Sequence, residues 1–183
     1  ANLDKDYLDD LRETYEGTRL GRQEIHAEYL GEADGALWNR EILDTCLKDN
    51  IGSTHEDRVE FAKTLSRVII SIDPAISHNE ESDLTGIVVA GVDVNGKGYI
   101  LEDHTGTYTP QGWAAKAVHL YNEFSADRIV AEKNQGGAMV RSTLTSEDET
   151  VPIRLVHASR GKFARAEPVS ALYEQGKVFH AKG

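Results

Sequence analysis

Short apolar runs separated by polar turns dominate the second half of the chain. The Val and Ile residues of the run RVIISID, at 67–73, predict a buried strand. Similar runs predict strands at 85–93 and 98–104, and the Asn-Gly pair between these two strands is typical of a tight hairpin turn. We therefore expect a meander of three consecutive strands joined by short connections.

Helical segments alternate with strands after residue 104. The first, at 109–124, predicts a helix with Thr109 as its N-cap and Pro110 in its first turn. Pro168 must lie in the first turn of the last predicted helix or bend it. The remaining expected elements are strands at 128–133, 152–159 and 177–181 and helices at 136–144 and 163–175. A meander followed by helical crossovers predicts an α/β fold, a mixed sheet with helices on both faces.

The first 60 residues follow a helical pattern instead. Five apolar side chains in the segment 3–15 share one face at helical spacing: Leu3, Tyr7, Leu8, Leu11 and Tyr15. A second short helix is expected at 21–30, and a connector with two glycines then leads to another short helix. The polar stretch 48–57 predicts a loop. We place the main boundary of the chain near residue 60.

Composition limits the class of protein. Of the 183 residues, 39% are hydrophobic and 28% are charged, which is typical of a soluble globular protein. No apolar run approaches the roughly 20 residues of a membrane-spanning helix, and the acidic, amphipathic start predicts no secretory signal. The single cysteine, Cys46, excludes an internal disulfide and a cysteine-rich zinc site. The seven histidines lack metal-ligand spacing and are expected to be structural or exposed.

Two carboxylates stand at the ends of predicted strands, in a chain whose net charge is −11. Such a charge argues against binding nucleic acid by bulk electrostatics, but not against an acidic centre neutralised by metal. Asp73 ends one strand and Glu132 stands near the end of another, so both emerge at one edge if these strands are adjacent and parallel. Carboxylate oxygens bind Mg²⁺, and two such ions would serve phosphoryl transfer. Asp73 could instead only cap the turn that follows it.

Further candidate residues lie close to these carboxylates in the sequence. Asp83 precedes the second strand and is expected either as a supporting ligand or as a cap. In the segment KNQGG, Lys133 is followed by Gly136 and Gly137, and paired glycines at a helix start allow close approach to a phosphate. A simple turn explains the same glycines.

The densest basic cluster of this acidic chain is SRGKFAR, at 159–165. It contains Arg160, Lys162 and Arg165. Basic residues near an acidic metal centre suit the phosphate backbone of DNA. The alternative is a solvated start of the helix that follows.

Three stretches together resemble the nuclease domain of tailed-phage large terminase subunits: VIISIDPAIS with ESDLTGIVVAG, DRIVAEKNQGGAMV, and VHASRGKFARAEPVSALYEQGKV. The resemblance covers most of residues 67–180 and implies a ribonuclease H-like fold. It also implies metal-dependent cleavage of concatemeric double-stranded DNA during genome packaging, with two Mg²⁺ or Mn²⁺ ions. Matched motif to motif, Asp73 corresponds to the first-strand metal ligand, Glu132 to the fourth-strand acid and Asp83 to an auxiliary acid.

The resemblance further implies the surroundings of the domain. The segment GRQEIHAEYLGEADGALWNREIL is similar to the link between the terminase ATPase and its nuclease, so residues 1–60 are expected to be a helical linker from the end of the ATPase domain and 61–183 the nuclease domain. In the parent protein, the partners would be the ATPase domain, the portal and the small terminase subunit, in the cytoplasm of the bacterial host and without a membrane. DNA is expected to contact Lys133, Gly136, Gly137, Arg160, Lys162 and Arg165.

Two features depart from the family pattern. The chain has no GxxxxGKS/T phosphate loop, so the ATPase motor is not expected in it. The family carries a further catalytic aspartate on a late helix, and no such DxxDAL-like segment occurs before Gly183. Glu167 and Glu174 lie in the wrong element to replace it. We therefore expect the nuclease domain to lack its final helix here, and this chain to bind metal weakly and cut poorly.

Three other functions stay open. A junction resolvase or another ribonuclease H-like nuclease would share Asp73 and Glu132. A sugar-kinase or actin-like ATPase also begins with a strand-end aspartate, but it needs glycine-rich phosphate turns that the segment DPAISHNEES does not offer. A packaging module without catalytic activity would only dock on partner proteins.

Overall fold

The computed structural model describes residues 14–18, 21, 37–75, 84–133 and 137–182. The helices expected at 3–15 and 21–30 therefore lie almost wholly outside the described residues. Contacts divide the chain into two compact units, one formed by 1–47 with 160–179 and the other by 48–159 with 180–183. Within the described ranges, no helix has the length and apolar character needed to cross a bilayer.

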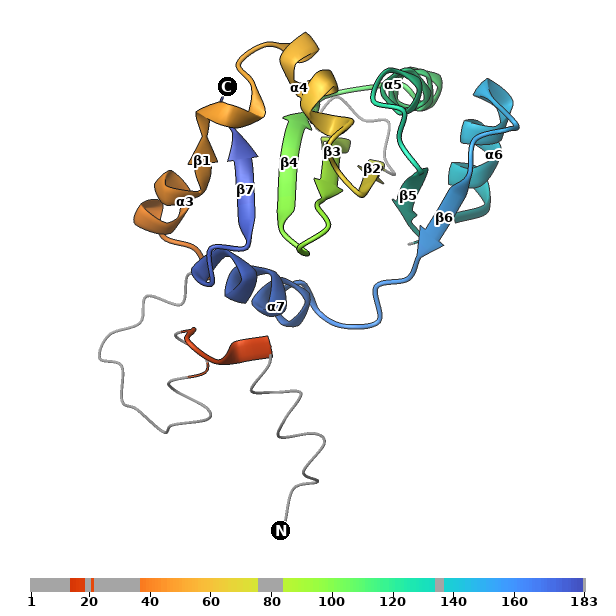
Figure 1. Ribbon diagram of the computed structural model, residues 1–183. Helices are drawn as coiled ribbons and strands as arrows, with labels where there is room; N and C mark the ends of the chain where they lie inside the picture. The colour runs from red at the N-terminus through yellow and green to blue at the C-terminus, as the bar shows by residue number, and fades with distance from the viewer. Residues whose placement is uncertain (1–13, 19–20, 22–36, 76–83, 134–136, 183) are drawn as a thin grey trace. The chain divides into compact units, whose positions relative to one another are not determined.

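A seven-stranded sheet, in the order β1-β7-β4-β3-β2-β5-β6, is the central feature of the structure (Figure 1). Its strands are β1 (Leu47–Lys48), β2 (Arg67–Asp73), β3 (Gly86–Val92), β4 (Gly98–Asp103), β5 (Arg128–Glu132), β6 (Ile153–Val156) and β7 (Val178–Ala181). The strands β2, β3 and β4 form the expected antiparallel meander, and β2, β5 and β6 run parallel. The predicted mixed sheet is confirmed, and every predicted strand is present within three residues of its expected bounds.

The hairpin between β3 and β4 has the expected turn chemistry. Asp93 Oδ1 accepts hydrogen bonds from the backbone N–H groups of Asn95 and Lys97, at 2.8 and 2.9 Å. Gly96 has a φ of +78°, a conformation that glycine adopts without steric cost. These bonds lower the pKa of Asp93, chiefly through the N–H of Lys97.

The core of the second unit lies between this sheet and α5 (Pro110–Glu123), which packs against β2, β3 and β5. Alternate residues of these three strands are buried, among them Ile70, Ile72 and Ile129. Burying each of these side chains contributes about 1.5–3 kcal/mol. The predicted cap of α5 is confirmed, because Thr109 Oγ1 accepts from the N–H of Gly112 at 3.0 Å. The helix α6 (Gly137–Glu147) packs against α5 and β6.

The predicted loop at 48–57 is wrong in part. A 3-10 turn, η1, occupies Asp49–Ile51, and the helix α4 begins at His55 and ends at Ala62. Thr54 and Asp57 form a reciprocal capping box, in which each side chain accepts from the backbone N–H of the other residue at 3.1–3.2 Å. The polar stretch is therefore a helix start, because its polar side chains satisfy N–H groups that the helix leaves unpaired.

The first unit contains α3 (Arg40–Cys46) and α7 (Lys162–Glu174), which contact each other. Trp38 packs edge-on against Tyr173, with ring centroids 5.7 Å apart. The side chain of Gln175 donates to the carbonyl of Thr14 at 3.0 Å. Pro168 lies inside α7 and not in its first turn, because the helix already begins at Lys162.

The division expected near residue 60, between a linker and a nuclease domain, is a functional one and stays a prediction. The helix α4 packs against β4, so residues on both sides of position 60 belong to the second unit.

Candidate functional site

Asp73 and Glu132 end two adjacent parallel strands. The register pairs Ile72 of β2 with Ala131 of β5, so Asp73 and Glu132 occupy the next position on each strand. Ile72 and Ala131 are buried on the α5 side. Because side chains alternate, Asp73 and Glu132 share the opposite side, which we call the carboxylate face.

Adjacent strands lie about 4.8 Å apart, so the two carboxyl groups are expected within about 8 Å of each other. On β3, the residue paired with Asp73 is Gly86, which has no side chain to cover it. Asp73 is exposed, and no hydrogen bond or ion pair joins its carboxylate to any residue that the structure describes. On the other side, Glu132 pairs with Val156 of β6 and is partly covered.

This donor set fits a hard divalent cation. Two carboxylates on one face repel each other unless a cation lies between them, and Mg²⁺ takes oxygen ligands while keeping several waters. Among the described residues, no group of three or more His, Cys, Asp or Glu side chains is placed to hold a metal ion. Asp83, the third predicted ligand, lies outside those residues. The metal roles of all three acids stay predictions.

The structure describes only part of the KNQGG segment, in which the sequence predicts close approach to a phosphate. Lys133 is exposed, Gly137 is buried as the first residue of α6, and Gly136 lies outside the described residues. A Cβ added to Gly137 would lie 2.3 Å from Cγ of Lys133, so glycine lets the chain pack closely there. That contact favours the alternative of a simple turn, and the contact of these residues with DNA stays a prediction.

The basic cluster lies at the start of α7, in the first unit. Arg160, Lys162 and Arg165 are all exposed, and Gly161 caps the helix without a side-chain hydrogen bond. Cations at a helix N-terminus oppose the helix dipole by about 0.3–1 kcal/mol each. Their position therefore does not stabilise the helix, and their contact with DNA stays a prediction.

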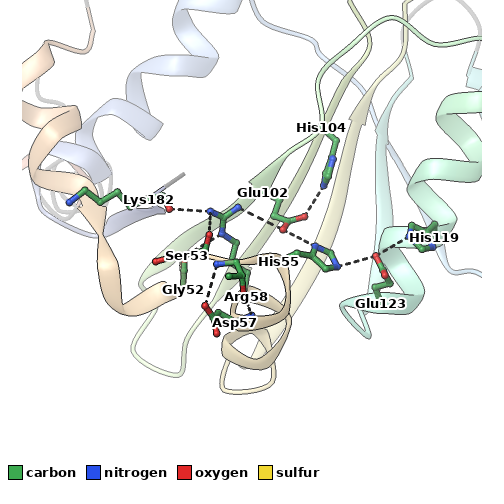
Figure 2. A network of polar contacts seen from close by, with 11 residues as sticks. Gly52, Ser53, His55, Asp57, Arg58, Glu102, His104, His119, Glu123 and Lys182 are labelled. Atoms are coloured by element: carbon green, nitrogen blue, oxygen red, sulfur yellow. Dashed lines mark hydrogen bonds and ion pairs between the residues drawn. The ribbon is translucent and has the colours of Figure 1, made fainter.

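Sequence reasoning missed a polar network on the other face of the sheet (Figure 2). Its centre is Glu102, which is 7% exposed and pairs with buried Val89 in the β3–β4 register. His104 Nε2 lies 2.7 Å from one carboxylate oxygen of Glu102, and His55 Nδ1 lies 2.8 Å from the other. Arg58 Nη1 lies 3.8 Å from the latter oxygen. Glu102 is therefore a buried acid surrounded by positively charged or hydrogen-bonding groups.

The network continues to α5. His55 Nε2 lies 3.3 Å from Glu123, and His119 Nε2 lies 3.1 Å from the same oxygen, as Figure 2 shows. The hydrogen bond with Glu102 raises the pKa of His55 above its ordinary value, and partial burial opposes this shift. His55 therefore joins α4 to both β4 and α5.

One sequence signal that was missed could have indicated part of this network. The pattern Thr54-x-x-Asp57 is typical of a helix N-terminus, which would place His55 and Arg58 on one helix. Nothing in the sequence links that helix to Glu102, because 47 residues separate His55 from Glu102. The sequence predicts histidines that are structural or exposed, and three of the seven agree: His55 and His104 are part of this network, and His119 at its end is 59% exposed.

The seven-stranded mixed sheet with its helices matches the ribonuclease H-like α/β class. The family model described as "Terminase RNaseH-like domain" matches residues 70–183. The chain therefore belongs to the terminase ribonuclease H-like domain family, whose structural relatives are nuclease domains of large terminase subunits. No significant match was found among curated protein sequences.

Solved structures similar to the chain include terminase nucleases of phages and the human cytomegalovirus terminase nuclease domain. The large terminase of the thermophilic bacteriophage D6E is 11% identical, with a TM-score of 0.58 over 98% of this chain and 41% of that chain. A mutant nuclease domain of the large terminase subunit gp2 of bacterial virus Sf6, with manganese, is 14% identical, with a TM-score of 0.51 over 80% and 74%. Another Sf6 nuclease structure, with manganese and beta-thujaplicinol, is 19% identical, with a TM-score of 0.46, and the chain spans 47% of its length. At these identities the likeness concerns the fold alone.

Proposed function

We propose that this domain is the metal-dependent endonuclease of a phage large terminase, which cleaves concatemeric double-stranded DNA during genome packaging. The observation that carries the proposal is the parallel register of β2 and β5, which brings Asp73 and Glu132 to one edge and one face of the sheet. Membership of the terminase ribonuclease H-like family supports the same activity.

The two acids have distinct parts in this proposal. Asp73 is the open ligand, because no described side chain competes for its oxygens. Glu132 is the second ligand, and its partial cover from the neighbouring strand restricts its side chain. Asp83 is proposed as an auxiliary ligand. Bound Mg²⁺ or Mn²⁺, as two ions, would offset charge on phosphate oxygens and lower the pKa of a bound water.

The choice of metal rests on chemistry and on relatives. Carboxylate oxygens select hard cations over soft ones. Structures of related nuclease domains are described with manganese and with calcium.

The proposed partners follow from the same family. Double-stranded DNA is the substrate, and Arg160, Lys162 and Arg165 are proposed to contact its phosphates, together with Lys133 and the Gly136–Gly137 turn. The ATPase domain, the portal and the small terminase subunit are the proposed protein partners in the bacterial cytoplasm. A similar large terminase is more than twice as long as the part that this chain matches, so these partners belong to the proposal for the whole protein.

A plasmid-nicking assay tests the function. The whole protein should nick or linearise supercoiled DNA with Mg²⁺ or Mn²⁺, this chain should do so more weakly, and the DNA should stay intact with a chelator. Asp73→Asn and Glu132→Gln should abolish cutting, whereas Asp49→Asn, which removes an 81% exposed carboxylate elsewhere, should not. Equal cutting by all three variants would remove the carboxylate pair from the mechanism.

A substrate panel separates the alternatives. Preference for branched DNA would indicate a resolvase, and preference for RNA–DNA hybrids would indicate another ribonuclease H-like nuclease. Absence of cutting in both this chain and the whole protein would favour a docking module.

A further inference from the structure

Three arginines lie on the carboxylate face, on three consecutive strands. Arg67 is the first residue of β2, Arg128 is the first residue of β5, and Arg154 is the second residue of β6. All three strands are parallel to one another. The set is thus formed by the sheet and not by a local run of sequence.

The register places these side chains on one side of the sheet. Arg128 pairs with Ile69 of β2, and Arg154 pairs with Val130 of β5. Positions two apart on a strand share a face, so Arg67 and Ile69 lie on the same side as Asp73. By the same rule, Arg128 and Val130 lie on the same side of the sheet as Glu132. Arg154 lies on that side too, because it pairs with Val130.

The three arginines form a diagonal row. Each step, from Arg154 to Arg128 and from Arg128 to Arg67, crosses one strand and moves two residues along it. With strands about 4.8 Å apart and about 3.3 Å per residue, each step is about 8 Å between Cα atoms. The same step separates Arg154 from Glu132, so the row begins beside the carboxylates.

None of these side chains has a carboxylate partner among the described residues. Acidic residues outnumber Lys and Arg by 31 to 20 in this chain, yet no ion pair or side-chain hydrogen bond is formed by Arg67, Arg128 or Arg154 with any residue in the described ranges. Arg67 and Arg154 are exposed. Nε of Arg128 is buried and lacks a hydrogen-bond partner. This is unfavourable for stability, so a role in binding would explain why the position holds an arginine.

We propose that Arg154, Arg128 and Arg67 bind the sugar-phosphate backbone of the DNA whose phosphodiester is presented to Asp73 and Glu132. Guanidinium groups bind phosphate oxygens in a bidentate manner and remain charged at every relevant pH. A row of three guanidinium groups with Cα atoms about 8 Å apart can contact several phosphates of one DNA strand. This inference rests on the proposed function, and it adds a DNA-binding surface distinct from the SRGKFAR cluster.

Salt-dependent binding tests the arginine row. The full 183-residue chain carrying Arg67→Gln, Arg128→Gln and Arg154→Gln is titrated against a short fluorescent duplex without divalent metal, so that cleavage cannot contribute. Each lost phosphate contact lowers the slope of log K against log salt by about 0.9, so the triple variant should lose about 2.7 units. A control with Arg40→Gln, Lys116→Gln and Lys182→Gln has the same change in net charge and should keep the wild-type slope.

Equal slopes for the two triple variants would contradict the proposal that the arginine row binds DNA. If the wild type still nicked plasmid DNA, the proposed nuclease function would stand without this binding surface. Conversely, a reduced slope in a chain that cuts no DNA would support the row as a DNA-binding surface while the nuclease proposal fails. If the triple variant does not fold, Arg154→Gln on the edge strand β6 is compared with Arg40→Gln, and the expected difference is about 0.9 units.

Discussion

Acidic residues on the two faces of one sheet have opposite surroundings. On the α5 side, Glu102 is 7% exposed and lies within 2.8 Å of two imidazoles and 3.8 Å from a guanidinium. On the carboxylate face, Asp73 is exposed and has no side-chain partner among the described residues, although Glu132 ends the neighbouring strand. The fold surrounds Glu102 with compensating groups and leaves Asp73 without one among the described residues.

This difference separates stability from function. A buried acid must be paired, because an isolated charge in the interior is strongly unfavourable. Asp73 has no such partner among the described residues, and neighbouring carboxylates repel each other. A position that the fold does not use for its own stability is therefore the better candidate for binding a cation.

The largest expected effect comes from the carboxylate face. Asp73→Asn, made in the whole protein, should lower nuclease activity by several orders of magnitude at matched Mg²⁺ or Mn²⁺. The free energy of unfolding should stay the same or rise, because the substitution relieves repulsion from Glu132. Plasmid nicking and urea denaturation measure the two quantities. Activity like that of the wild type would contradict the role of Asp73.

Substitution of Glu102 should lower the free energy of unfolding, in contrast to substitution of Asp73. Glu102→Ala leaves His55, Arg58 and His104 around an empty buried site, and removing one partner of such a buried pair costs about 3–5 kcal/mol. Glu102→Gln keeps the shape and part of the hydrogen bonding, so its loss should be smaller. Urea denaturation checks both variants. If Glu102→Ala unfolds at the wild-type urea concentration, the network does not stabilise the fold.

The sequence predicted the carboxylate face better than the opposite one. Asp73 and Glu132 each end an apolar strand, so the strand pattern alone placed them at one edge once β2 and β5 were expected to be parallel neighbours. Pairing between Glu102 and His55 depends on how α4 packs on β4, and no periodicity in the sequence encodes that contact. The start of α4 was missed because the capping box of Thr54 lies in a stretch whose polar composition predicts a loop.

The basic cluster should have a moderate effect. Changing Arg160, Lys162 and Arg165 to alanine removes up to three phosphate contacts, so the salt slope of DNA binding should fall by about 0.9 units for each contact. Fluorescence titration at several salt concentrations measures this slope. The alternative is pairing of the cluster with acids such as Glu167 and Glu174, worth about 1 kcal/mol or less. An unchanged slope and affinity would support that alternative.

The smallest expected effect concerns pH and His55. Its pKa is raised chiefly by the hydrogen bond with Glu102, and the charges of Glu102, Glu123 and Glu56 act in the same direction, while burial opposes them. In addition, Arg58 and the two other imidazoles of the network, His104 just after β4 and His119 on α5, lie close to these acids. The net direction of the pKa shift is nevertheless upward, so at pH values between the ordinary and the raised pKa the folded chain binds more protons at His55 than the unfolded chain.

Stability from protonated His55 should therefore be fully present below its ordinary pKa of about 6.5 and be lost as pH rises through the raised value. Burial lowers the pKa of His180, so that residue contributes the opposite trend, with stability lost as pH falls. The measurement is therefore the difference in free energy of unfolding between the wild type and His55→Gln, from urea denaturation at pH values between 5.5 and 8.5. This difference should decrease as pH rises. The corresponding difference for a control substitution at a more exposed site, His119→Gln, should decrease less. A difference independent of pH would show that His55 stabilises the contact between α4 and the sheet in its neutral form.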